Sequence, residues 1–242
     1  MIAKKTVLLY NLNVIGVIME LFVKYLCSFL ALIIVLPLHE FAHAFSAVKS
    51  GDDTPKLMGR YSLNPLRHFD PLGLVCMVLV GFGWAKPVVV NPDNFKHRTL
   101  DSLWVAVSGV LTNVITAFLV YPLLILSYRL DQQNLFFYIL TNVLNNIVVM
   151  SVVFAVFNFL PLKPLDGFRV IQAFTKPYNK FRVFMEKYSE YFLIVLVALD
   201  FMGEYLSKVY YGFGYMRILS MTIAYLGNKL LIPIGMFWGL IF

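Results

Sequence analysis

The chain has 242 residues, of which 60% are hydrophobic and 14% charged, and its formal net charge is +7 at pH 7. Together with a mean hydropathy of +0.77, this composition excludes a soluble globular protein and is typical of a polytopic membrane protein. The cations lie in loops between apolar segments and do not form a basic tract with aromatics, so no nucleic-acid partner is expected.

Apolar residues extend along nearly the whole length, which leaves no room for a large soluble domain. We therefore predict a single integral membrane domain over residues 1–242. No cleavable signal peptide is evident after Lys4 and Lys5. Cys27 and Cys76 lie in apolar stretches, so we interpret them as buried hydrophobic residues and not as a disulfide or a metal pair.

The first long apolar segment of the chain ends in a polar motif. Residues 7–19 are apolar but contain two asparagines, and they are predicted to form either an interfacial helix or part of a further span. Residues 21–48 are long enough to cross ~30 Å of hydrocarbon as a helix. The end of this segment carries His39, Glu40 and His43 in the pattern H-E-x-x-H.

The spacing of this motif predicts a zinc site. Positions four apart lie on one face of a helix, so both imidazoles can point at one Zn²⁺, with Glu40 beside them to act on a bound water. Two histidines and a carboxylate are costly in hydrocarbon, which favours a functional role. The alternative is that both histidines bond neighbouring carbonyls inside a helix bundle.

Residues 72–90 differ from the predicted spans. A short apolar run at 74–80 is followed by glycines at alternate positions, Gly81 and Gly83, and then by three valines. These residues disfavour a continuous helix. We predict a short helix that leads into a re-entrant extended segment near residues 81–90, shielded at membrane depth by protein or by a water-filled cavity.

The rest of the chain contains further apolar segments. Four of them are predicted to span the membrane, at residues 103–128, 135–160, 190–210 and 216–242. The third is less regular, because Asp200 and Glu204 interrupt it. The predicted fold class is an all-α polytopic membrane protein, a bundle of about five to six transmembrane helices with the re-entrant extended segment.

Loop cations orient these segments. They gather in three regions, 49–67, 86–98 and 163–187, whereas the turn 129–134 holds one cation and one acid. By the positive-inside rule the three cation-rich regions share the cytoplasmic side, and the turn lies on the opposite side. The motif is then expected toward the cytoplasmic face, and residues 72–90 must enter the membrane and return.

A catalytic zinc ion usually takes a third protein ligand. Asp166 is the best candidate, because it follows the span 135–160 at the membrane face to which the motif helix runs. Pro161 and Pro164 unwind the chain there and bring the carboxylate back toward the membrane. Taken alone, Asp166 is more simply explained as the N-cap of the following segment. The histidine motif at the same depth favours the ligand interpretation.

Two motifs in the chain carry a family resemblance: H-E-x-x-H at residues 39–43 and N-x-x-P-x-x-x-L-D-G at residues 158–167. With both of them, the chain resembles the site-2 protease family of intramembrane zinc metalloproteases, in its compact bacterial branch without a PDZ domain. The resemblance covers roughly residues 30–172. It implies a catalytic core at about 21–172, followed by C-terminal helices at about 188–242. A family pattern near Ser108 keeps Gly109 and Asn113 but lacks its proline.

The resemblance implies an intramembrane endopeptidase that hydrolyses peptide bonds in or near transmembrane segments of membrane-protein substrates, as in regulated intramembrane proteolysis. The implied roles are Zn²⁺ ligands for His39, His43 and Asp166, and general base for Glu40. Asn158 is the implied donor to the oxyanion.

Other side chains are candidates for contact with the substrate. Asn113 is a second candidate oxyanion donor, and interhelical hydrogen bonding is the alternative for both asparagines. Gly81 and Gly83 are candidate substrate-binding positions, because an extended segment at 81–90 offers a strand edge to a substrate chain. His68 and Asp70 are expected to be structural.

The expected partners are transmembrane protein substrates and the lipid bilayer, and the expected location is a bacterial inner membrane. Substrate identity and oligomeric state do not follow from the sequence. The alternative function is a non-hydrolytic metal-binding scaffold or a transporter, for which Asp200 and Glu204 would form an ion pathway. A salt-bridged surface turn explains those two residues better, and a transporter has no need of Glu40 between its ligands.

Overall fold

The computed structural model describes residues 2–80 and 83–242. Its described part is helical, and the β structure there is one isolated bridge between Phe69 and Ala85. The helices are α1 (Ile2–Lys49), α2 (Thr54–Leu57), α3 (Pro71–Val80), α4 (Arg98–Ser127), α5 (Leu135–Phe159), α6 (Asp166–Phe174), α7 (Lys180–Leu206) and α8 (Ile218–Gly239). Three short 3₁₀ turns join them: Pro65–Arg67, Pro92–Asn94 and Tyr211–Met216. The all-α fold class is confirmed.

Four helices of the described chain are long and apolar enough to cross a membrane: Gly16–Lys49 of α1, and the whole of α4, α5 and α8. They make the chain an integral membrane protein. Residues 7–19 belong to α1 itself and run without a break into the predicted span 21–48. The predicted span 190–210 corresponds to α7, which is not one of the four. Its charged residues, including Asp200 and Glu204, explain the difference.

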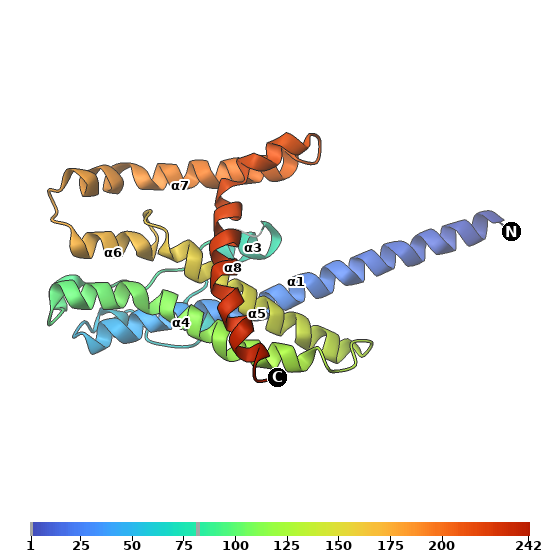
Figure 1. Ribbon diagram of the computed structural model, residues 1–242, viewed down its shortest axis with the longest axis horizontal. Coiled ribbons are helices and arrows are strands. Elements are labelled where there is room, and N and C mark those ends of the chain that lie inside the picture. Colours follow the sequence, from blue (N-terminus) through green and yellow to red (C-terminus); the bar gives the residue numbers. More distant parts are fainter. Residues whose placement is uncertain (1, 81–82) are drawn as a thin grey trace.

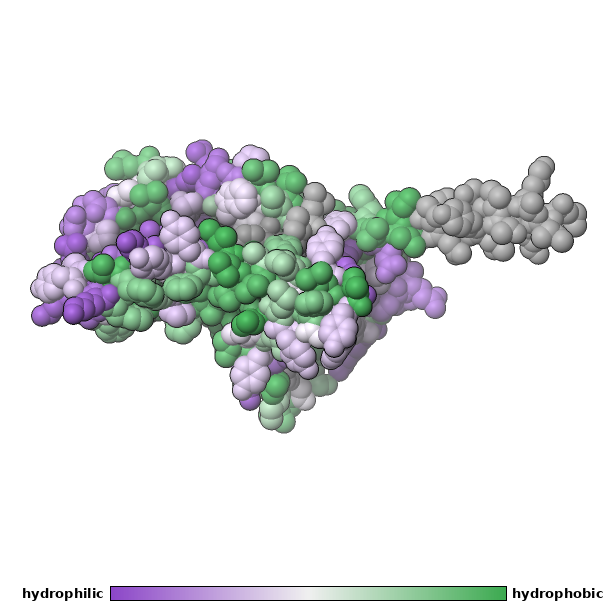
Figure 2. Space-filling view, turned by 90° about the horizontal axis from the view of Figure 1, so that it is seen from above, coloured by the Kyte–Doolittle hydropathy of each residue, from purple (hydrophilic) through white to green (hydrophobic). Residues whose placement is uncertain are grey.

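Helices α1, α4 and α5 form the central bundle, and α8 crosses over α4 and α5 (Figure 1). Small side chains let these helices approach closely, since Ala31 of α1 and Ala117 of α4 are fully buried at the contacts. Val152 of α5 and Ile234 of α8 pack in the same cluster as Ala117. Figure 2 shows green, hydrophobic side chains over the middle of the molecule, which is the surface that a bilayer would cover.

The segment after α3 returns along the protein in an extended form, as the sequence predicts. Lys86 N–H donates to the carbonyl of His68 at 2.8 Å, next to the bridge between Phe69 and Ala85. Gly83 lies so close to α3 that a Cβ there would overlap the carbonyl of Gly73. Gly81 lies outside the described residues.

Candidate metal centre

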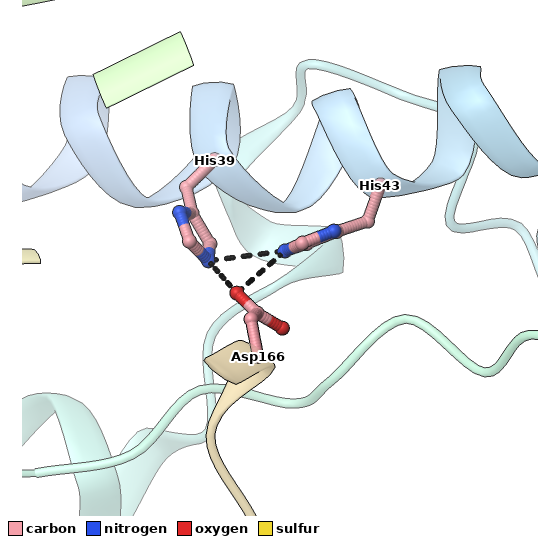
Figure 3. Close-up of side chains that lie close together, drawn as sticks. All are labelled: His39, His43 and Asp166. Atoms are coloured by element: carbon pink, nitrogen blue, oxygen red, sulfur yellow. Dashed lines mark hydrogen bonds and ion pairs between the residues drawn. The ribbon is translucent and has the colours of Figure 1, made fainter. Parts of the chain in front are cut away.

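Three buried side chains meet between α1 and the start of α6 (Figure 3). His39 Nε2 and His43 Nε2 are 3.2 Å apart. Asp166 Oδ2 lies 3.1 Å from His43 Nε2 and 3.3 Å from His39 Nε2. The structure therefore brings together the three residues that the sequence predicts as metal ligands.

The chain between α5 and α6 explains how Asp166 reaches the histidines. Pro161 and Pro164 fall in the irregular stretch between these helices, where the chain turns back. The N-cap of α6 is Leu165, so Asp166 is the first helical residue and not the N-cap. A Cβ at Gly167 would overlap the last carbonyls of α5, so only glycine lets α6 begin this close to that helix.

The donor set fits a zinc ion. Four-coordinate zinc with ligands at 2.0–2.1 Å separates its donor atoms by about 3.3–3.4 Å, close to the spacings between His39, His43 and Asp166. Two imidazole nitrogens and one carboxylate oxygen also form a donor set that catalytic zinc sites use, with a further position left for water.

Helix α4 orients both imidazoles through contacts with their Nδ1 atoms, which point away from Asp166. His43 Nδ1 is 2.8 Å from the carbonyl of Val105, and a carbonyl can only accept, so Nδ1 carries a proton in both the neutral and the charged form of the ring. His39 Nδ1 is 3.1 Å from the amide of Asn113. A Cβ at Gly109, midway between these two α4 residues, would overlap both rings. The two partners are thus eight residues apart on α4, with Gly109 midway between them.

Asp166 is held as an anion. Burial by itself raises the pKa of this carboxyl group, but the charge of His43 and the hydrogen bonds from both histidines outweigh burial and keep the pKa well below its usual range. Oδ1 of Asp166 faces the guanidinium of Arg169 at 3.8 Å. The residue therefore offers an ionised oxygen to a cation.

Comparison with known proteins finds relatives that are all named as zinc metalloproteases. The chain is 38% identical over 172 residues to the "Putative zinc metalloprotease YwhC" of Bacillus subtilis (strain 168), which covers 70% of this chain and 78% of that protein. The chain belongs to the site-2 protease family. It is also 29% identical over 169 residues to the "Putative zinc metalloprotease Rip2" of Mycolicibacterium smegmatis, over 68% of this chain and 62% of that protein.

A third relative is the "Putative zinc metalloprotease Rip2" of Mycobacterium tuberculosis, 26% identical over 216 residues, which are 87% of this chain and 80% of that protein. No family model matches the chain, and no solved structure matches it significantly.

Glu40 of this family member faces the extended segment. Its Oε2 accepts a hydrogen bond from Val88 N–H at 3.1 Å. Glu40 directly follows His39 on α1, so its carboxylate lies beside the three-residue cluster without being part of it. This contact was not evident from the sequence, because it joins residues 48 positions apart in different elements.

The far end of the extended segment is held by Asp52. Its carboxylate accepts from Asn91 N–H and Asn94 Nδ2, both at 2.7 Å, and from the hydroxyl and N–H of Thr54. Burial alone raises the pKa of Asp52, but these four donors lower it below its ordinary value. Asp52 therefore ties the chain beyond α1 to the chain beyond the extended segment.

The remaining candidate residues form their hydrogen bonds with residues outside the cluster. The Asn158 amide donates to the carbonyl of Phe154 at 3.1 Å, a bond within α5. Its role as an oxyanion donor stays a prediction. His68 Nε2 bonds the carbonyl of Ser62 at 2.7 Å, and Asp70 caps the start of α3, so both have structural roles.

Asp200 and Glu204, near the end of α7, are paired with residues at the start of α8. Glu204 Oε2 lies 2.6 Å from Arg217 Nη1, and Asp200 accepts from the N–H and hydroxyl of Ser220. These contacts are those of a salt-bridged turn, which the sequence favours over an ion pathway.

Proposed function

We propose that the chain is an intramembrane zinc endopeptidase that hydrolyses peptide bonds in or near the transmembrane segments of membrane proteins. The observation that carries the proposal is the buried triangle of His39, His43 and Asp166, with donor atoms 3.1–3.3 Å apart. The names of the relatives support the same chemistry.

His39, His43 and Asp166 are the residues that would hold zinc. When bound, zinc polarises the scissile carbonyl and lowers the pKa of a water molecule toward neutrality. The protein contributes the geometry: Val105 and Asn113 orient the imidazoles from behind, and burial excludes bulk solvent from the three donor atoms.

Glu40 is the general base in this proposal. Its carboxylate takes a proton from the attacking water, and then delivers that proton to the leaving amine as the peptide C–N bond breaks. The hydrogen bond from Val88 N–H fixes the carboxylate next to the segment along which a substrate chain would lie. Asn158 is the proposed donor to the oxyanion, and to fill this role its amide must exchange its bond to Phe154.

We propose that the substrate pairs with the extended segment that ends at Val90. A transmembrane helix hides its own peptide bonds, and addition to an exposed strand edge draws such a chain into an extended form. Among the described residues, the backbone pairing of this segment is limited to the contacts of Ala85 and Lys86 with residues 68 and 69. Gly83 and Gly81 keep their proposed role in a close approach of backbones.

The basic regions 49–67, 86–98 and 163–187 support a location of the metal centre toward the cytoplasmic side of a bacterial inner membrane. The alternative of a non-hydrolytic transporter is not favoured, because Asp200 and Glu204 are paired with Ser220 and Arg217.

The experiment is a cleavage assay with a transmembrane peptide and protein purified in detergent with its zinc content measured. Glu40→Gln is expected to keep zinc and to lose cleavage by at least about 100-fold, because the base is removed and the ligands are not. Glu204→Gln, a matched change on α7, is expected to cleave like the wild type. Bound zinc with cleavage that does not depend on Glu40 would overturn the proposal.

A further inference from the structure

The amide of Asn113 contacts one of the three candidate ligands. Nδ2 lies 3.1 Å from His39 Nδ1, and the side chain is fully buried. Oδ1 of the same amide has no hydrogen-bond partner among the described residues. Leaving a buried polar atom without a partner is unfavourable, so the orientation of this amide needs an explanation.

The position of the proton on the His39 ring explains the orientation of the Asn113 amide. When Nδ2 donates to Nδ1, the proton of a neutral imidazole must sit on Nε2, the nitrogen that faces Asp166. A metal ligand must instead offer the lone pair of Nε2, which moves the proton to Nδ1. Nδ1–H then requires an acceptor, and a half-turn of the Asn113 amide brings the unpartnered Oδ1 into that position.

We propose that Asn113 is a positioning residue that sets the tautomer of His39, donating to Nδ1 without metal and accepting from Nδ1–H when metal is bound. The inference rests on the proposed function, since it concerns the same metal centre. His43 differs from His39, because the carbonyl of Val105 accepts in either state and holds His43 in the metal-binding tautomer. Asn113 is then engaged with an imidazole, and the oxyanion must be stabilised by another group.

Two variants separate an acceptor from a donor at this position. Asn113→Leu keeps the volume and removes both polar atoms, whereas Asn113→Asp keeps acceptor oxygens and removes the donor. Zinc affinity is measured on chelator-stripped protein by competition with a chromophoric chelator. We expect Asn113→Leu to bind zinc 10–100-fold more weakly, as is typical when an orienting hydrogen bond to a ligand is lost, and roughly wild-type affinity for Asn113→Asp.

The control is Asn142→Leu, since the Asn142 amide donates to the carbonyl of Tyr138 within α5 at 2.8 Å. This variant is expected to bind zinc like the wild type. The tautomer is observed directly by ¹⁵N NMR of the histidines in zinc-free protein. We expect the His39 proton on Nε2 in the wild type and on Nδ1 in Asn113→Asp, a readout that a merely structural role would not change.

Wild-type zinc affinity in Asn113→Leu, or an unchanged His39 tautomer in Asn113→Asp, would overturn the inference. So would a loss of cleavage in Asn113→Asp with zinc affinity unchanged in both variants, because that pattern identifies an oxyanion donor. These results differ from a failure of the proposed function, in which the wild type itself binds no zinc or cleaves no peptide.

Discussion

At the residue scale, the metal centre depends on one position without a side chain. Gly109 lies on α4 between Val105 and Asn113, and a Cβ there would overlap the rings of His39 and His43. The glycine lets α4 approach α1 closely enough for both Nδ1 atoms to find partners. The conformational freedom of glycine plays no part, since α4 is helical throughout.

We predict that Gly109→Ala weakens zinc affinity by at least about 10-fold and lowers cleavage in parallel, because the added methyl displaces both imidazoles from their α4 partners. Competition with a chelator measures the affinity. Gly239→Ala is the matched control, since a Cβ at that glycine meets no atom within 4 Å. Equal zinc affinity in the two variants would contradict the account.

The sequence could predict which residues form the cluster, because helical spacing places His39 and His43 on one face and two prolines return the chain at Asp166. It could not predict that Val105 and Asn113 orient the imidazoles. That contact depends on the register of α4 against α1, which tertiary packing sets. The four-residue spacing of Gly109 and Asn113 was the available signal, and on its own it does not name a partner helix.

At the element scale, the extended segment is held at both of its ends. The bridge between Phe69 and Ala85 holds the first end, and Asp52 holds the second through Asn91 and Asn94. Between them, Val88 meets Glu40. The glycines and valines of the segment predicted its extended form correctly. The residues that hold its two ends lie in loops without hydrophobic periodicity, so the sequence did not identify them.

Asp52→Asn is predicted to lower the free energy of unfolding by about 2 kcal/mol at neutral pH, since charge-assisted hydrogen bonds are lost. The folded pKa of Asp52 lies below its unfolded value. Its contribution is therefore fully present above the unfolded pKa of about 3.9 and disappears as the pH falls through the folded pKa.

Melting temperatures of the purified protein at several pH values measure this effect. We expect wild type and Asp52→Asn to differ by roughly 4–8 °C at pH 7, with the gap closing in acid. Asp53→Asn is the control, because the contact of the Asp53 carboxylate within the described part of the chain is an exposed ion pair with Lys56, which contributes little. A gap that is independent of pH would show that the charge of Asp52 does not matter.

Helix α7 shows where element prediction is weakest. The sequence predicted a span at residues 190–210, but α7 begins at Lys180 and carries enough charge to fall outside the four membrane-crossing candidates. Composition alone cannot separate a span from a long helix with a paired polar end. The pairing of Glu204 with Arg217 depends on the turn into α8.

At the scale of the whole molecule, α1, α4 and α6 supply the residues of the candidate metal centre inside a membrane protein. Composition predicted the membrane and the helical class, since a chain this apolar cannot be a soluble globule. The angle at which α8 crosses α4 and α5 (Figure 1) was not predictable, because it follows from side-chain packing of Ile234 against the Ala117 cluster.

The proposed orientation predicts that α4 and α5 are joined outside the cytoplasm. Alkaline phosphatase, which is active only outside the cytoplasm, is fused at Asp131 between α4 and α5, or at Pro177 between α6 and α7. The Asp131 fusion is expected to be active and the Pro177 fusion inactive, by the distribution of loop cations. The reverse pattern would place the metal centre toward the other face.

The central claim is that His39, His43 and Asp166 hold one zinc ion. X-ray absorption at the zinc edge of the purified protein tests it most directly, because it reports the ligand atoms themselves. The account predicts one zinc per chain bound by nitrogen and oxygen only, with two imidazoles at about 2.0–2.1 Å. A sulfur ligand, which only Cys27, Cys76 or a methionine could supply, or protein that cleaves without zinc, would contradict it.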